Sequence, residues 1–177
     1  MALDQVLSML IANVTKLIPL RFHMVYDFQQ GIHFWMGKAK KQLKPGLHVT
    51  VPFVGDIVAL TTVEQVVETE HITVMTSDRK SATLSLAVAY QIEDLIKYFT
   101  KVQDFDQSLL NVAEREVNAA VAKRRASEVM EQRDAILEEV EEAVRTKASE
   151  WGTNVLNIGF VNFAVVPALR LFQDAAT

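Results

Sequence analysis

Residues Ser81–Ile92 read SATLSLAVAYQI, and this stretch decides which fold the chain can adopt. Large apolar side chains occupy every second position, and smaller or polar side chains stand between them; the apolar set is Leu84, Leu86, Val88, Tyr90 and Ile92. Successive side chains of a strand point to opposite faces of its sheet, so a period of two predicts a strand with one face on a hydrophobic core. One-sided strands of this kind are typical of antiparallel sheets.

The sequence between Arg21 and this strand also has β character. FHMVYDF and IHFWM are separated by Gln29-Gln30-Gly31, a hairpin-like turn signal. Further strands are expected at about residues 47–53, 56–63 and 65–76. Residues 37–46, GKAKKQLKPG, are interpreted as a loop punctuated by its Pro-Gly pair.

Helices follow the strand. Asp94 is expected to cap a short helix that ends near Val102, and Asp104, with Gln107 three positions later, to cap a longer one. A second long helix is expected over about residues 128–151, with Gly152 as its C-cap. Each long helix has one apolar stripe: Leu109, Leu110, Ala113, Val117, Ala120 and Val121 on the first, and Val129, Ile136, Leu137, Val140, Val144 and Ala148 on the second.

The last segment, TNVLNIGFVNFAVVP, reads as a strand again. Its apolar phase shifts between Phe160 and Val161, which predicts a bulge or a bend. Strands, two long helices and a returning strand predict an α+β fold with a mixed, mainly antiparallel sheet and two packed helices.

An amphipathic helix is predicted before this domain, within residues 1–20. At about 100° per residue, eight apolar side chains fall in one arc: Leu3, Val6, Leu7, Leu10, Ile11, Val14, Leu17 and Ile18. Pro19 is expected to end the helix. The segment lacks the ~18–20 consecutive apolar residues of a spanning helix. Its arc is therefore expected either to lie in a bilayer interface or to pack on protein.

Composition and motifs argue against several classes of function. The 177 residues carry a formal charge of −4, which disfavours binding to nucleic acid, and they contain no cysteine, which removes thiol chemistry. The four histidines stand apart without a metal-ligand spacing, and no nucleophile elbow or phosphate loop is present. We therefore predict a protein without enzymatic activity, cofactor or metal.

A single concentrated positive patch consists of Lys38, Lys40, Lys41 and Lys44. A basic segment beside a membrane attracts anionic headgroups with about 1 kcal/mol per lysine. The cluster is therefore a candidate headgroup contact, with Phe22 as a second contact, and a solvated loop is the alternative interpretation.

The residues themselves resemble the stomatin, prohibitin and flotillin superfamily, whose shared module is the SPFH, Band 7 or prohibitin-homology domain. QQGIHFWMGKAKKQLKPGLHVTVPFVGDIVAL is similar to the family's opening, and TSDRKSATLSLAVAYQI to its Thr-x-Asp turn and alternating strand. ASEVMEQRDAI, with Arg133, is similar to the entry of the long helix, and EWGTNVLNIGFVNF to the Trp-Gly turn beyond it. The resemblance covers nearly everything from Val25 to Leu171, so we divide the chain into the helix at 1–20, an SPFH domain at 21–172 and a tail at 173–177.

Three departures from the family pattern are visible. The N-terminal segment is short and amphipathic instead of a long apolar hairpin, and no coiled coil follows the domain. Glu68-Thr69-Glu70-His71 replaces a common Pro-Pro step. Oligomers held together by a coiled coil are therefore in doubt, whereas side-by-side packing of the domains is not.

The resemblance implies a non-catalytic membrane scaffold, in which many copies surround a patch of bilayer and regulate integral proteins such as a membrane protease or a channel. We expect a cyclic homo-oligomer of many copies, with a homologous second subunit as a variant of it, and the interface is expected at Arg124, Arg125, Glu131, Arg133, Glu138 and Glu139. Because Lys16 lies near the end of the apolar arc, and Arg21 and the lysine cluster follow it, a peripheral or monotopic protein with a cytoplasmic domain is favoured. The alternative is a soluble assembly or adaptor protein whose first helix packs on neighbouring subunits.

Overall fold

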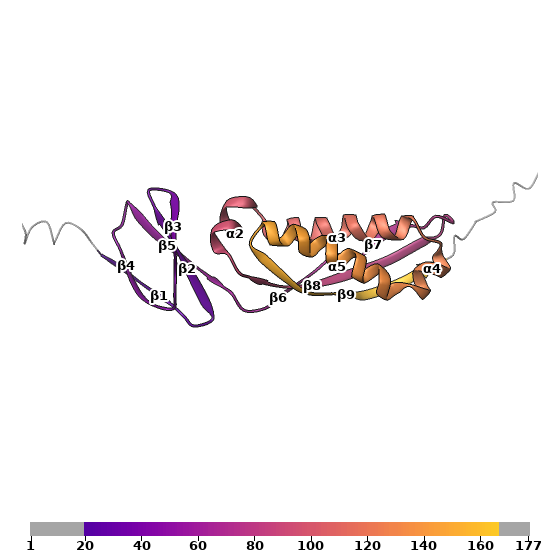
Figure 1. Ribbon diagram of the computed structural model, residues 1–177, viewed down its shortest axis with the longest axis horizontal. Helices are drawn as coiled ribbons and strands as arrows, with labels where there is room; N and C mark the ends of the chain where they lie inside the picture. Colours follow the sequence, from indigo (N-terminus) through magenta and orange to yellow (C-terminus); the bar gives the residue numbers. More distant parts are fainter. Residues whose placement is uncertain (1–19, 167–177) are drawn as a thin grey trace, which may run out of the picture. The chain divides into compact units, whose positions relative to one another are not determined.

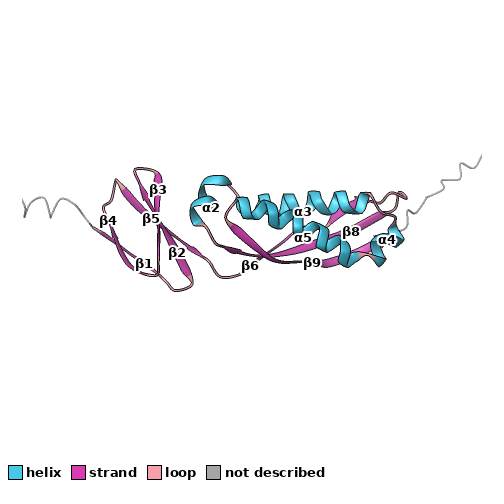
Figure 2. Cartoon of the chain, viewed as in Figure 1, coloured by secondary structure: helices cyan, strands magenta, loops and turns pink. Residues whose placement is uncertain are grey.

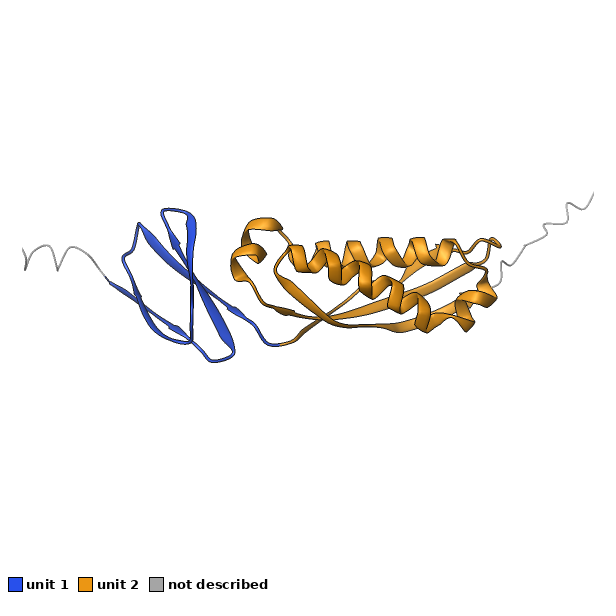
Figure 3. Cartoon of the chain, in the orientation of Figure 1, with its two compact units in different colours: residues 1–63 blue, residues 64–177 orange. Residues whose placement is uncertain are grey.

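A computed structural model describes residues 20–166 of the chain. The predicted helix within residues 1–20 and the tail at 173–177 thus lie outside the described residues, apart from Leu20. The chain forms two compact units, residues 1–63 and 64–177, and each has its own sheets (Figures 1 and 3). Figure 2 shows that the first unit is built from strands, whereas the second combines strands with helices.

Two small antiparallel sheets make up the first unit. Strands β1 (Arg21–Val25) and β4 (Gly46–Thr50) form one sheet. The other has the order β3–β2–β5 and contains β2 (Gln29–Trp35), β3 (Lys38–Leu43) and β5 (Gly55–Thr61). Val25, Ile32 and Ile57 are buried and form the core of this unit.

The prediction of a loop over residues 37–46 is wrong, because Lys38–Leu43 is strand β3. Among the described strands it pairs only with β2, so it is an edge strand there. Edge strands tolerate lysines, which keep the open edge in water, so β3 lacks the apolar alternation by which a strand is recognised. A register shift between His33 and Phe34 of β2 leaves Lys40 as the extra residue of a bulge.

The second unit is organised around β8 (Ser81–Ile92), whose apolar alternation was read correctly from the sequence. Strand β9 (Thr153–Val166) pairs along one edge of β8, while β6 (Gln65–Glu68) and β7 (Ile72–Met75) pair end to end along the other. The predicted bulge is confirmed at Val161, and a second register shift leaves Leu156 unpaired. Every strand pairing among the described residues is antiparallel.

Helices cover one face of this sheet (Figure 1). Helix α3 (Phe105–Ala122) packs against β6 and β7, and α5 (Arg133–Glu150) packs against α3 and β9. The short α2 (Leu95–Lys101) begins at Asp94, whose carboxylate accepts hydrogen bonds from the backbone N–H groups of Ile96 and Lys97, as expected of an N-cap. The predicted α+β class is thereby confirmed.

The prediction of a single helix over residues 128–151 is wrong in one respect. It is two helices, α4 (Ala126–Glu131) and α5, which are separated at Gln132, where ψ is 30°. Gln132 N donates a hydrogen bond to Glu128 O at the end of α4, and Gln132 O accepts one from Ile136 N at the start of α5. Val129 of α4 and Ile136 of α5 are both buried, so the apolar stripe stays in phase and the sequence pattern does not reveal the interruption.

Candidate functional site

Exposed apolar side chains lie across one face of the β1–β4 sheet in the first unit. Phe22 of β1 pairs with Val49 of β4, and Met24 pairs with Leu47. These four side chains alternate with residues that point to the opposite face, and their exposed fractions run from 49% for Val49 to 67% for Phe22. We name Phe22, Met24, Leu47 and Val49 the β1–β4 apolar face. A cluster of exposed, neighbouring apolar side chains is a candidate interaction site.

Two turns of the same unit add further apolar side chains. Met36 and Gly37 form the two-residue connection between β2 and β3, and both have positive φ, at 50° and 76°. Hairpin turns with positive φ at both positions usually place Asn or Asp where Met36 stands. Phe53, between β4 and β5, has φ of 76° and is 99% exposed. The two turns are joined by a hydrogen bond of 2.7 Å from Met36 N to Val54 O.

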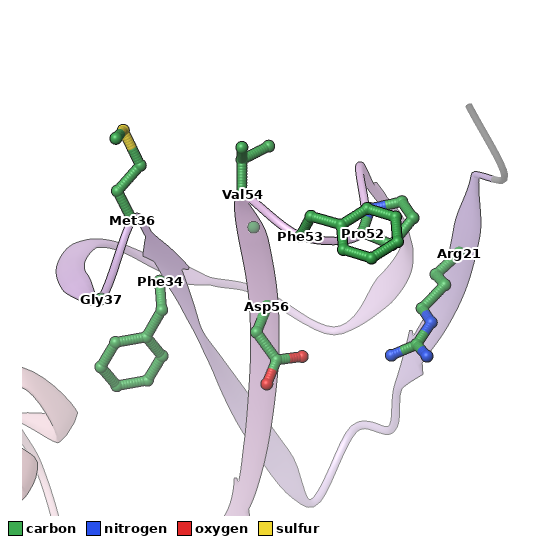
Figure 4. A pocket seen from close by; sticks show the side chains of 9 residues that line it. Arg21, Phe34, Met36, Gly37, Pro52, Phe53, Val54 and Asp56 are labelled. Carbon is green, nitrogen blue, oxygen red and sulfur yellow. The ribbon is translucent and has the colours of Figure 1, made fainter. Parts of the chain in front are cut away.

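A cleft of about 580 Å³ opens between these turns and the start of β1. Figure 4 shows its lining side chains, with Met36 and Val54 pointing away from the strands and the Arg21 and Asp56 head groups below them. The lining set is Arg21, Phe34, Met36, Gly37, Pro52, Phe53, Val54, Gly55 and Asp56. Phe34 and Asp56 are directly opposite each other in the β2–β5 ladder, so their side chains share a face.

The charges of the chain are divided unevenly between the two units. Residues 20–63 contain five basic and two acidic residues, a formal charge of +3, whereas residues 64–166 contain eleven basic and eighteen acidic residues, a formal charge of −7. The candidate headgroup lysines Lys38, Lys40 and Lys41 are exposed on β3, and Lys44 is exposed beyond its end. None of the four forms an ion pair with a described residue.

The residues expected at an oligomer interface lie in several places in the second unit. Arg124 and Glu139 are brought together within one chain: the Arg124 guanidinium donates hydrogen bonds to Ala120 O at 2.7 Å and to Glu139 Oε2 at 2.9 Å. Arg133 lies over the Phe163 ring, with 4.8 Å between its guanidinium carbon and the ring centroid. The other three, Arg125, Glu131 and Glu138, are exposed.

Asp78 and Tyr90 in the second unit have shifted pKa values, and the causes are contacts within the fold. Hydrogen bonds from Thr76 Oγ1 at 2.6 Å and Ala126 N at 3.0 Å lower the pKa of Asp78 to about 2. Burial, and then a 2.6 Å hydrogen bond to Asp106, raise the pKa of Tyr90. Within residues 20–166, no His, Asp and Glu side chains are grouped so as to hold a metal ion.

Sequence reasoning found part of this surface and missed the rest. Phe22 and the lysines were identified, but Met24, Leu47 and Val49 were not, although their alternation along FHMV and LHV was a usable signal. The cleft carries no signal in the sequence, because only the topology brings its lining segments together.

Comparison with known proteins identifies the class to which this fold belongs. The model of the SPFH domain / Band 7 family matches residues 28–168, so the chain belongs to this family. Its members are typically membrane-associated, oligomeric scaffolds without enzymatic activity. Among residues 20–166, no helix is both long and apolar enough to cross a bilayer.

The chain is also similar to individual proteins. An uncharacterized protein of Methanocaldococcus jannaschii is 23% identical over 132 residues, which span 75% of this chain and 66% of that relative. One from Methanothermobacter thermautotrophicus is 21% identical over 86% of this chain and 48% of its own length. A protein of Acanthamoeba polyphaga mimivirus that carries the band 7 family name is 21% identical over 77% of this chain and 45% of its own length. The chain thus spans about half to two thirds of the length of these relatives.

Proposed function

We propose that this protein is a non-catalytic scaffold that binds a membrane surface, assembles through its SPFH domain into a ring or cage of many copies, and organises or regulates the integral proteins of that membrane patch. The observation that carries the proposal is the β1–β4 apolar face in a unit of formal charge +3. Exposed apolar side chains and exposed lysines within one unit match an interface whose outer layer is anionic and whose interior is apolar.

The energetics favour binding by many copies together. Complete burial of a Val, Leu, Met or Phe side chain contributes about 1.5–3 kcal/mol. The four side chains of the β1–β4 apolar face are already partly covered, so one copy gains only part of that amount. Joining copies in one assembly multiplies weak contacts by avidity. The predicted apolar arc from Leu3 to Ile18 immediately precedes β1 and supplies a second contact in each copy.

The proposed function also includes a side of the membrane and a class of partner. Basic residues accumulate on the cytoplasmic side of membranes, so the lysines of β3 favour a cytoplasmic domain, peripheral or monotopic. The regulated partner would be an integral protein such as a protease or a channel, and a homologous second subunit is compatible with lateral packing. The exposed residues Arg125, Glu131 and Glu138 remain the candidates for that packing.

A soluble assembly or adaptor protein is the alternative, in which neighbouring subunits cover the apolar surfaces. Liposome flotation separates the two functions. Wild-type protein should float with vesicles, and Leu7→Asp with Leu10→Asp, or Met24→Asp with Val49→Asp, should stay in the soluble fraction. Val66 and Met75 are exposed on the second unit, so Val66→Asp with Met75→Asp is the matched control and should still float. Wild-type rings that remain soluble would overturn the membrane function.

Assembly is tested separately by analytical ultracentrifugation with and without lipid. We expect a large species whose population rises with protein concentration. A monomer at all concentrations and in both conditions contradicts the scaffold. Head-to-tail contacts form a ring only if the rotation from one copy to the next returns to the first copy, and otherwise they form an open filament. Electron microscopy of the large species distinguishes the two.

A further inference from the structure

We propose that the cleft between Arg21 and Asp56 binds the headgroup of a zwitterionic phospholipid, with the phosphate at Arg21 and the ammonium group at Asp56. This inference rests on the proposed membrane role and adds to it a choice of lipid. The candidate lysines of β3 select negative charge in general, whereas this cleft would select a phosphate and an ammonium joined by a short linker.

The cleft contains one positively and one negatively charged side chain. Arg21 and Asp56 line the same cleft but form no ion pair with each other. Asp56 Oδ1 accepts one hydrogen bond, of 3.0 Å, from the backbone N–H of Ile57, and no described residue forms an ion pair or hydrogen bond with the Arg21 guanidinium. A simple anion would be repelled by Asp56 and a simple cation by Arg21. A ligand that carries both charges satisfies both groups at once.

The rim of the cleft is apolar, which favours a lipid over a free headgroup. Met36, Phe53 and Val54 stand around the opening and would contact the glycerol and the first acyl carbons. Phe34 lies opposite Asp56 on the same face, where an aromatic ring adds attraction for an ammonium group.

The backbone of the rim is strained at Phe53. Phe53 holds a left-handed conformation with φ of 76°, and a non-glycine residue in this region costs on the order of 1–3 kcal/mol. Phe53 is 99% exposed, so its ring gains almost nothing from packing on residues 20–166. Strain that supports a fully exposed aromatic side chain points to a contact made outside the chain.

The test compares the full-length protein on two kinds of vesicle, neutral ones of phosphatidylcholine with phosphatidylethanolamine and anionic ones enriched in phosphatidylglycerol. Asp56→Asn should weaken binding to neutral vesicles by up to about fivefold, the upper end of the range for an exposed ion pair. On anionic vesicles the same change should leave binding equal or stronger, because a negative charge is lost. Arg21→Gln should weaken binding to both. Asp27→Asn, an exposed carboxylate of the same unit outside the cleft, should not weaken either.

Several outcomes would overturn the inference. If Asp56→Asn and Asp27→Asn change binding to neutral vesicles equally, the cleft does not bind the headgroup. The membrane scaffold would still be supported in that case if the wild-type protein floats with vesicles. Absence of wild-type binding to either vesicle would overturn both proposals. Full competition by soluble phosphoethanolamine, together with unchanged vesicle binding by Phe53→Ser, would identify a soluble ligand in place of a lipid. Circular dichroism and thermal unfolding of each variant separate a lost contact from a lost fold, and Asp56→Glu should restore binding to neutral vesicles.

Discussion

At the scale of single residues, Gly152 is the one of the six glycines at which an added Cβ atom would make the shortest contact. Its φ is 83°, and a Cβ atom there would lie 2.5 Å from the carbonyl oxygen of Asp94. The Gly152 carbonyl also accepts hydrogen bonds from Glu93 N and Asp94 N, so the backbone cannot easily move away. We expect Gly152→Ala to lower the free energy of unfolding by about 2–4 kcal/mol, measured by urea denaturation. Gly159→Ala is the matched control, because that Cβ meets open space, and an equal loss in both variants would contradict this account.

The lowered pKa of the Asp78 carboxyl group predicts how the free energy of unfolding depends on pH. Its pKa falls from an ordinary 3.8 to about 2, first through the Thr76 hydroxyl and then through the Ala126 N–H. A carboxyl with a depressed folded-state pKa contributes stability that is fully present above the unfolded value and is lost as the pH falls through the folded value. Wild type should therefore lose stability between about pH 4 and pH 2 more steeply than Asp78→Asn, which should be less stable at neutral pH. Parallel curves of unfolding free energy against pH for the two proteins would refute this.

At the scale of elements, Arg124 joins the end of α3 to α5. Its guanidinium caps the carbonyl of Ala120 and pairs with Glu139, and only 22% of its side chain is exposed. Arg124→Ala should thus lower the unfolding free energy by about 1–2 kcal/mol. Arg125→Ala, one residue further, should change it by less than about 0.5 kcal/mol, because that residue is exposed. If the proposed lateral interface includes Arg125, Arg125→Ala should weaken assembly more than Arg124→Ala does, as measured by sedimentation.

Elements could be predicted where one face of the element meets the core. Strand β8 met this condition, and so did the bulge at Val161, where the phase of buried residues changes. Strand β3 did not, because an edge strand rich in lysine has no apolar period and owes its conformation to pairing with β2. The break at Gln132 stayed hidden because the buried apolar stripe keeps its phase from Val129 to Ile136. The cleft requires Arg21 and Asp56 to be brought together by topology, which no local pattern encodes.

At the scale of the whole molecule, the division of charge between the two units is the feature with the widest consequence. A chain of net charge −4 would be repelled by an anionic surface if its charge were spread evenly. Residues 20–63 carry +3 and residues 64–166 carry −7, so the sign of the interaction depends on which unit approaches the surface. Oligomerisation multiplies this asymmetry, because every added copy contributes one positively charged and one negatively charged unit.

The strand β3 lysines allow that division of charge to be tested. A lysine near an anionic bilayer contributes about 1 kcal/mol, so Lys40→Gln with Lys41→Gln should weaken binding to anionic vesicles by roughly 30-fold at low salt. The difference from wild type should shrink as salt is added, since screening acts on the same charges. Lys97→Gln with Lys101→Gln removes two exposed lysines from α2 in the acidic unit and should change binding little. If both double variants bind equally weakly, net charge governs the association and the first unit has no special part in it.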